Sequence, residues 1–377
     1  MATPLPARNI FDGTSAPVTS TFKTALGALR DYLAETIGVL GGGPIVPSLN
    51  GGQLAGMRNR IINGDMRIDQ RNGGAVAPLA ASTTNFLIDR MNAYVQGAAT
   101  TGQRQTGGGP ESSVLINTIL INGAAGLTAV GVLQGIESAN SRDMAGKVVT
   151  LSIWAYQNTG VSLPVYGAIN RYVTLDTAAG DVADVVLSMS PSSLPTGVWT
   201  KLTGTGALTS AATKGIEPYI GVSGTIGSGT QVMYALYQLE LGSVATAFEQ
   251  RPIGLELAMC QRYYEKSFPQ GTKPAQALGT VLSGANRFSA GRAGGSGANN
   301  YGFISYKTPK RIAPTTIVGY SPISANALPL DSTLGVDCSS YSVFSGEPGI
   351  YLSVQGAAST AVGNGIDWAW TADAEIY

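Results

Sequence analysis

The chain has 377 residues with 23 basic and 23 acidic side chains, so its formal net charge is zero. Only 12% of its residues are charged, and it lacks the basic surplus that captures nucleic acid or an anionic membrane. Histidine is absent, which excludes a Ser-His-Asp triad, a Cys-His pair and a histidine-ligated metal within one chain.

The remaining composition indicates a folded chain with many tight turns. Apolar residues make up 44% of the sequence, and its 50 glycines and 19 prolines favour short strands over long helices. Few charges suit a subunit that buries much of its surface in an assembly. We expect no secretion signal and no membrane insertion, because no apolar run is long enough to span a bilayer. Cys260 and Cys338 are expected to be free, buried thiols, with a disulfide between them as the alternative.

The N-terminal region combines an arm, a helix and a linker. Residues 1–16 are interrupted by proline and glycine and predict an extended arm. Residues 18–40 carry one apolar stripe at helical spacing. The stripe consists of Phe22, Leu26, Leu29, Leu33, Ile37 and Leu40. Such a helix packs either on its own domain or in a short coiled coil between identical chains, and we favour the coiled coil as a trimerisation element. Residues 41–56 are rich in glycine and proline and predict a linker.

Residues 57–250 have the pattern of a sheet protein. Residues 147–156 alternate, with Val149, Leu151 and Ile153 on one side and polar or aromatic residues on the other. Further short strands follow, separated by turn residues, and Asn63-Gly64 suggests a hairpin turn. No long helical pattern intervenes, which argues against a parallel α/β fold. We therefore predict a jelly-roll-like antiparallel β-sandwich.

The last third is predicted to hold a connecting helix and a second β domain. Residues 251–267 have helical spacing, with Pro252 suited to the first turn. Residues 268–377 contain more short strands and form a smaller C-terminal tip domain that ends in a strand. The expected fold class is mainly β.

Several segments occur in an order that resembles a known family. They are NRIINGDMRIDQRNGG (59–74), FLIDRMNAY (86–94), GKVVTLSIWAY (146–156), VWTKLTGT (198–205), YQLELGSVATAFEQRPIGLELAMCQRYYEKS (237–267) and the final WAWTADAEIY. This series resembles tail fibre and receptor-binding proteins of tailed bacteriophages and prophages.

The resemblance implies homotrimeric fibres with a carbohydrate-binding-like β-sandwich and a distal domain that meets the host surface. The arm and helix resemble a virion-attachment segment, so residues 1–16 are expected to bind a virion tail or baseplate protein. The protein would then reside in the virion tail, after assembly in the host bacterial cytoplasm, and bind a bacterial surface glycan. We expect residues 268–377 to set the host range.

Aromatic side chains beside hydroxyls and amides are candidates for sugar binding. Trp154 and Tyr156 share a face with Thr150 and Ser152, although such a face can also be an interface. Tyr166, Tyr172 and Trp199 are weaker candidates on the same reasoning. In the tip domain we expect surface contacts from Tyr301, Phe303, Tyr306, Tyr341 and Tyr351. Trp368 and Trp370 share a face with Ile366 and are expected in the core.

The sequence shows no evident catalytic centre and implies no cofactor. Cleavage of a polysaccharide needs paired carboxylates, and the aspartates are scattered without an evident pair. Asp65 and Asp69 lie near the Asn-Gly turn, where turn capping is favoured and a structural calcium is the alternative. The leading hypothesis is a tail fibre that binds a glycan without cleaving it. The alternatives are a tailspike-type depolymerase and a purely structural tail, baseplate or collar fibre.

Overall fold

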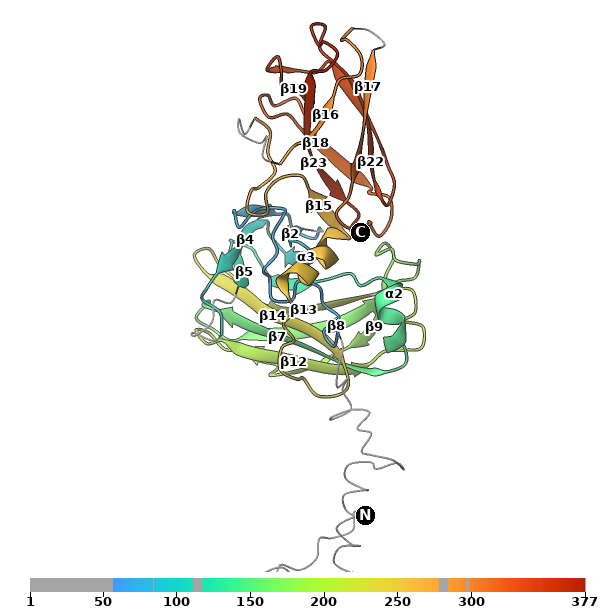
Figure 1. The fold of residues 1–377 in the computed structure, drawn as a ribbon. Helices are drawn as coiled ribbons and strands as arrows, with labels where there is room; N and C mark the ends of the chain where they lie inside the picture. Colours follow the sequence, from blue (N-terminus) through green and yellow to red (C-terminus); the bar gives the residue numbers. More distant parts are fainter. Residues whose placement is uncertain (1–56, 84, 111–116, 278–283, 296–297, 377) are drawn as a thin grey trace, which may run out of the picture. The chain divides into compact units, whose positions relative to one another are not determined.

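The computed structural model describes residues 57–376 except 84, 111–116, 278–283 and 296–297. The expected arm, the coiled-coil stripe from Phe22 to Leu40 and the linker lie outside these residues. Residues 57–377 make up one compact unit, and its described part is mainly β (Figure 1). It contains two short α-helices, Ser138–Ser141 (α2) and Ile253–Gln261 (α3), and a 3-10 turn, Arg142–Met144 (η2). Neither helix is long and apolar enough to cross a membrane.

Two seven-stranded antiparallel sheets contain most of the strands. The first sheet runs in the order Ala77–Leu79 (β1), Thr100–Thr106 (β4), Asn117–Asn122 (β5), Gln231–Leu241 (β14), Val148–Gln157 (β7), Thr200–Ala207 (β12) and Ser188–Ser190 (β10). The second runs Ser193–Leu194 (β11), Leu163–Arg171 (β8), Ile216–Ser223 (β13), Ala129–Leu133 (β6), Met91–Gln96 (β3) and Phe86–Ile88 (β2), with Val182–Val186 (β9) paired to β8.

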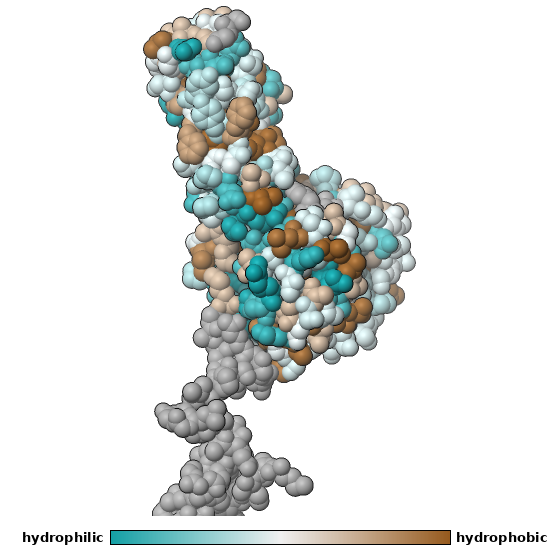
Figure 2. Space-filling model, turned by 90° about the vertical axis from the view of Figure 1, so that its right-hand side faces the viewer, coloured by the Kyte–Doolittle hydropathy of each residue, from teal (hydrophilic) through white to brown (hydrophobic). Residues whose placement is uncertain are grey.

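One apolar core lies between these two sheets. Leu151 and Ile153 of β7 pack in the same cluster as Val132 of β6 and Ile220 of β13. Successive strands change sheets, since β6, β7 and β8 alternate between them and so do β12, β13 and β14. The shared core buries one face of most of these strands and agrees with the predicted antiparallel β-sandwich. On the surface seen in Figure 2, apolar residues lie in small groups among polar ones.

The C-terminal strands form two smaller sheets. One contains Tyr264–Lys266 (β15), Gly365–Asp373 (β23), Leu330–Asp331 (β19), Val336–Asp337 (β20), Asn286–Ser289 (β16) and Thr316–Tyr320 (β18). The other contains Asn299–Ser305 (β17), Gly349–Gln355 (β22) and Ser340–Ser345 (β21). Their shared core contains Ile366, Trp368 and Trp370 of β23, which confirms the prediction that these residues are buried.

Three local predictions need correction. The helix expected over 251–267 is confined to α3, because the chain becomes strand β15 three residues after it. Asn63-Gly64 makes a turn but no hairpin, since no paired strands flank it among the described residues. The Asn63 side chain instead donates hydrogen bonds to the carbonyl oxygens of Ile68 (2.8 Å) and Asp89 (2.9 Å). The final strand ends at Asp373, whose carboxylate accepts a hydrogen bond from the Glu375 N–H at 2.9 Å. Cys260 and Cys338 are free and buried, as predicted.

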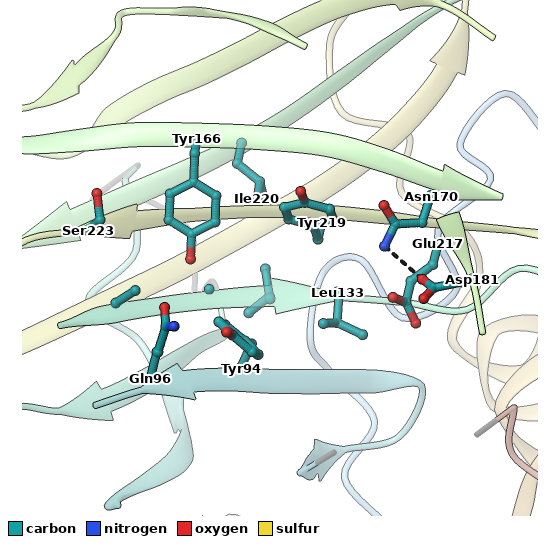
Figure 3. Close-up of a pocket in the computed structure, with 13 residues that line it drawn as sticks. Tyr94, Gln96, Leu133, Tyr166, Asn170, Asp181, Glu217, Tyr219, Ile220 and Ser223 are labelled. Carbon is teal, nitrogen blue, oxygen red and sulfur yellow. Dashed lines mark hydrogen bonds between the residues drawn. The ribbon is translucent and has the colours of Figure 1, made fainter. Parts of the chain in front are cut away.

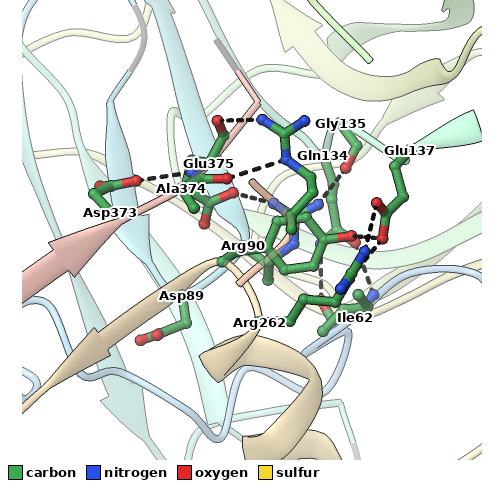
Figure 4. Close-up of polar contacts among 12 residues, drawn as sticks. Ile62, Asp89, Arg90, Gln134, Gly135, Glu137, Arg262, Asp373, Ala374 and Glu375 are labelled. Atoms are coloured by element: carbon green, nitrogen blue, oxygen red, sulfur yellow. Dashed lines mark hydrogen bonds and ion pairs between the residues drawn. The ribbon is translucent and has the colours of Figure 1, made fainter. Parts of the chain in front are cut away.

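Four of the six segments that carry the family resemblance meet in one ionic cluster, which we call the junction. Figure 4 shows its part around Arg90. The junction consists of Arg71, Arg90, Glu137, Arg262, Tyr263, Asp373 and Glu375. Arg71 lies 2.8 Å from the Asp373 carboxylate and 3.2 Å from that of Glu375. Arg90 pairs with the other oxygen of Glu375 and lies 3.5 Å from the centre of the Tyr263 ring. The junction ties residues 59–74, 86–94 and 251–267 to the C-terminal residues.

Candidate functional site

A groove of about 550 Å³ lies on the outer face of the second sheet (Figure 3). Its lining comes chiefly from β3, β6, β8 and β13. The residues that line it are Tyr94, Gln96, Ala129, Gly131, Val132, Leu133, Tyr166, Asn170, Asp181, Glu217, Tyr219, Ile220 and Ser223. None of these side chains is basic, and three of them are tyrosines.

Strand register creates the groove. Tyr94 of β3 pairs with Gly131 of β6, Gly131 pairs with Gly221 of β13, and Gly221 pairs with Tyr166 of β8. The row therefore has two glycines in the middle and a tyrosine at each side. A Cβ atom at Gly221 would lie 2.6 Å from the Tyr166 hydroxyl, and one at Gly131 would lie 2.7 Å from the carbonyl oxygen of Ile220. Glycine at these two positions leaves room for the Tyr166 ring, which lies across Gly221, and both glycines are buried.

Aromatic rings and hydroxyls line the centre of the groove. The rings of Tyr166 and Tyr219 lie 6.2 Å apart at an angle of 55°. The Tyr166 hydroxyl is buried and has no hydrogen-bond partner, and burial raises the pKa of this phenol. Gln96 and Ser223 add an amide and a hydroxyl to the lining. Aromatic faces beside such groups suit a ligand that has both apolar faces and hydroxyl edges.

The groove has an acidic end. Asn170 of β8 donates a hydrogen bond of 2.7 Å to Asp181, which lies between β8 and β9. Glu217 of β13 is paired with Asn170 in the strand register. Burial and, second, the negative charge of Asp181 raise the pKa of Glu217 to about 7. The sequence shows no evident carboxylate pair because these two acids lie on different elements, which only the fold brings together (Figure 3).

The sequence identified part of this site. Tyr166 was among the weaker candidates, whereas Tyr94, Tyr219 and Glu217 were missed. Alternation was a usable signal: Tyr94 and Gln96 alternate with buried Ala93 and Val95 on β3. A strand with polar and aromatic residues on its outward side is ordinary by itself, however, and only pairing across four strands makes a groove.

Trp154 and Tyr156 lie on the outer face of the first sheet. Both are half-buried, and the Tyr156 ring lies 5.7 Å from that of Trp199, whose Nε1 donates to the Gly108 carbonyl oxygen. The neighbouring Thr150 is buried because residues after β14 cover it, and its hydroxyl donates to the Gly242 carbonyl oxygen at 2.8 Å. The open platform expected on this face is therefore smaller than predicted, and sugar contact by Trp154 and Tyr156 stays a prediction.

The aromatic residues of the C-terminal sheets divide into two groups. Tyr301, Phe303 and Tyr351 are exposed on β17 and β22, and the rings of Tyr301 and Tyr351 stack at 5.7 Å. Tyr306 is only 7% exposed and packs edge-on against a core tryptophan. Tyr341 packs against the buried Trp368 at 5.6 Å. The expected surface role is thus wrong for Tyr306, whose ring completes the core, whereas Tyr341 is half-buried and its surface contact stays a prediction.

Three further candidates, one for sugar binding and two for calcium binding, make contacts within the fold. Tyr172 is fully buried with Ile62 and Cys260, which excludes a role in surface sugar binding. Asp69 accepts hydrogen bonds from the N–H groups of Asn72 (2.8 Å) and Gly74 (2.6 Å), so it caps a turn as favoured. Asp65 forms an ion pair with Arg67.

No protein-family model matches the chain, and none of the curated proteins matches its sequence. Among solved structures, the enzymatically active domain of tailspike protein 4 from bacteriophage CBA120 is similar with 14% identity and a TM-score of 0.30, over 48% of this chain and 21% of that one. The CBM22-2 xylan-binding domain of Paenibacillus barcinonensis Xyn10C is similar with 14% identity and a TM-score of 0.29, over 42% of this chain and 97% of that one.

A CBM4 domain is similar with 15% identity and a TM-score of 0.28, over 48% of this chain and 99% of that one. These likenesses are too weak to transfer a function.

Proposed function

We propose that this protein binds a bacterial surface glycan in the groove of the second sheet and does not cleave it. The row Tyr94–Gly131–Gly221–Tyr166 is the observation on which the proposal rests. Sugar rings present C–H faces that stack on aromatic rings and hydroxyl edges that need hydrogen-bond partners. The tyrosine rings that this row brings together, with Gln96 and Ser223 beside them, offer both kinds of contact to a saccharide.

Affinity electrophoresis of the full chain tests this proposal directly. The gels would contain a soluble polysaccharide, in separate runs xylan, mixed-linkage glucan and bacterial O-antigen. For a polysaccharide that retards the wild type, we expect Tyr94→Ala and Tyr166→Ala each to weaken binding about tenfold, because each loses a stacking surface. Tyr156→Ala, on the other sheet, is the matched control and should bind normally. Loss of binding in Tyr156→Ala alone would assign the glycan to the first sheet.

The wider role is a tail fibre or receptor-binding protein of a tailed bacteriophage or prophage. The support is the ordered series of segments from residue 59 to the C-terminus that resembles this family. The role includes a homotrimer built on the stripe from Phe22 to Leu40, attachment of residues 1–16 to a tail or baseplate protein, and host contact by residues 268–377. A stable monomer in light scattering of the intact chain would contradict the trimer. Exchange of residues 268–377 between relatives, with infection as the readout, tests the tip.

Cleavage of the glycan is the second candidate function. Glu217, whose pKa is raised to about 7, lies near a second carboxylate, that of Asp181. Glycoside hydrolysis uses a protonated acid beside another carboxylate. Release of oligosaccharides by the wild type, lost in Glu217→Gln, would establish a depolymerase. A protein that assembles into particles but binds no glycan would instead be a purely structural tail, baseplate or collar fibre.

A further inference from the structure

The acidic end of the groove is not neutralised by the part of the chain that the structure describes. Asp181 receives one amide hydrogen bond, from Asn170 at 2.7 Å. Glu217 has neither an ion pair nor a side-chain hydrogen bond to a described residue, and its electrostatic neighbour is the like-charged Asp181. The adjacent cation, Arg171, is engaged by Asp184 at 3.2 Å. Among the described residues, no cation therefore pairs with the carboxylates at this end of the groove.

Keeping an unpaired acid in this position has a cost. Burial opposes the charged form of Glu217, and the negative charge of Asp181 adds to the penalty. A glutamine would fill the same space without that penalty, so the carboxyl group calls for a functional explanation. A bound ligand that donates hydrogen bonds and carries positive charge would satisfy the carboxylates of Glu217 and Asp181.

The charge of the groove also defines which saccharides fit. A uronic acid, sialic acid or sugar phosphate would bring a third negative charge beside Asp181 and Glu217, with no lysine or arginine in the lining to offset it. An ammonium group on a sugar ring has the opposite effect. It can donate to both carboxylates in charge-assisted hydrogen bonds while the ring stacks on Tyr219 or Tyr166.

We propose that the groove selects glycans with a free amino group, held by Asp181 and Glu217 at its acidic end. This inference rests on the glycan-binding function proposed above and specifies the ligand class for that same groove. Its measurable consequence is an order of affinity among sugars, with the amino sugar bound most tightly, the neutral acetylated sugar second and the acidic sugar last.

Saturation-transfer difference NMR of the full chain at pH 7.5, where the Glu217 carboxyl is largely ionised, tests this preference with three glucose derivatives. The probes are glucosamine, N-acetylglucosamine and glucuronic acid. We expect glucosamine to bind at least fivefold more tightly than N-acetylglucosamine, and glucuronic acid to bind least. Glu217→Gln and Asp181→Asn should each reduce the preference for glucosamine while leaving N-acetylglucosamine binding unchanged, because the amides keep the size but lose the charge.

Glu347→Gln, in an exposed acid outside the groove, is the matched control and should keep the wild-type preference. The inference is overturned if N-acetylglucosamine or glucuronic acid binds as tightly as glucosamine, or if Glu217→Gln and Asp181→Asn both leave the preference intact. If none of the three sugars binds the wild type, or if Tyr166→Ala does not weaken any of them, the proposed glycan function itself fails.

Discussion

Glu217 links the stability of the sandwich to pH through a single carboxyl group. Its pKa is raised from 4.5 to about 7 by burial and by Asp181. Burial raises the pKa of three nearby phenols, and the charge of Glu217 raises it further; they are Tyr172, Tyr219 and Tyr237. A carboxyl group whose folded pKa lies above its unfolded value favours folding in its protonated form. The contribution of Glu217 to the free energy of unfolding is therefore fully present below about pH 4.5 and is lost as pH rises through 7.

Glu217→Gln should remove this loss. Above pH 7 we expect the variant to be more stable than the wild type by about 1–3 kcal/mol, because the buried charge is gone. At pH 4 the two proteins should unfold at nearly the same denaturant concentration. Urea unfolding at pH 4 and pH 8 makes the comparison, and Asp89, whose pKa is raised to about 6, titrates in both proteins and cancels. A variant less stable than the wild type at pH 8 would show that Glu217 has a cationic partner.

At the scale of the elements, the groove depends on four strands that keep one register. Gly131 and Gly221 face each other across β6 and β13, and each has backbone atoms where a side chain would begin. A shift of one residue in β13 would put Tyr219 into the core and Ile220 into solvent. The same pleat that buries Val132 and Ile220 therefore turns both glycines to the outer side, where Tyr166 covers Gly221.

Gly221→Ala should disturb both stability and binding. Its Cβ would lie 2.5 Å from the carbonyl oxygen of Val130 and 2.6 Å from the Tyr166 hydroxyl, so strands or rings must move, at a cost of about 1–3 kcal/mol. Gly227→Ala is the control, because no atom lies within 4 Å of its added Cβ. Thermal unfolding and affinity electrophoresis measure the two effects. Unchanged binding in a destabilised Gly221→Ala protein would mean that Gly221 supports the fold without contacting the glycan.

At the scale of the whole described unit, the junction connects the C-terminal residues to the sandwich. Glu375 shares its carboxylate between Arg71 and Arg90, and Arg311 donates to the Glu375 carbonyl oxygen at 3.0 Å. Arg90 and Glu375 are fully buried. Removing one partner from such a pair leaves an uncompensated charge, which costs more than the pair itself contributes.

Glu375→Gln should accordingly destabilise the protein by about 3–5 kcal/mol. The double variant Arg90→Met, Glu375→Gln should recover part of that loss, because it removes the charge left unpaired. Asp143→Asn breaks the exposed pair with Arg60 and should cost at most about 1 kcal/mol. Guanidinium unfolding compares the three. Equal losses of stability in Glu375→Gln and Asp143→Asn would show that the junction is solvated and does not couple the C-terminal residues to the sandwich.

The sequence by itself determined the features that depend on neighbouring residues. Alternation over 147–156 predicted a strand with one buried side, and the shared face of Ile366, Trp368 and Trp370 predicted a core, since side-chain direction in a strand repeats every second residue. Within the segments that carry the family resemblance, Gln238 and Glu240 bind the chain at Thr246 and Glu249, and four of the six segments contribute to the junction.

Only the tertiary structure decided where the groove lies. Tyr94, Gly131, Gly221 and Tyr166 belong to four strands that are distant in sequence, and no local pattern states that they pair in one row. Alternation also cannot tell which outer face stays open: residues after β14 cover Thr150, whereas the tyrosine face of the second sheet keeps a groove. The pairing of Asp181 with Glu217 has the same origin, because strand register and loop closure are set by long-range packing.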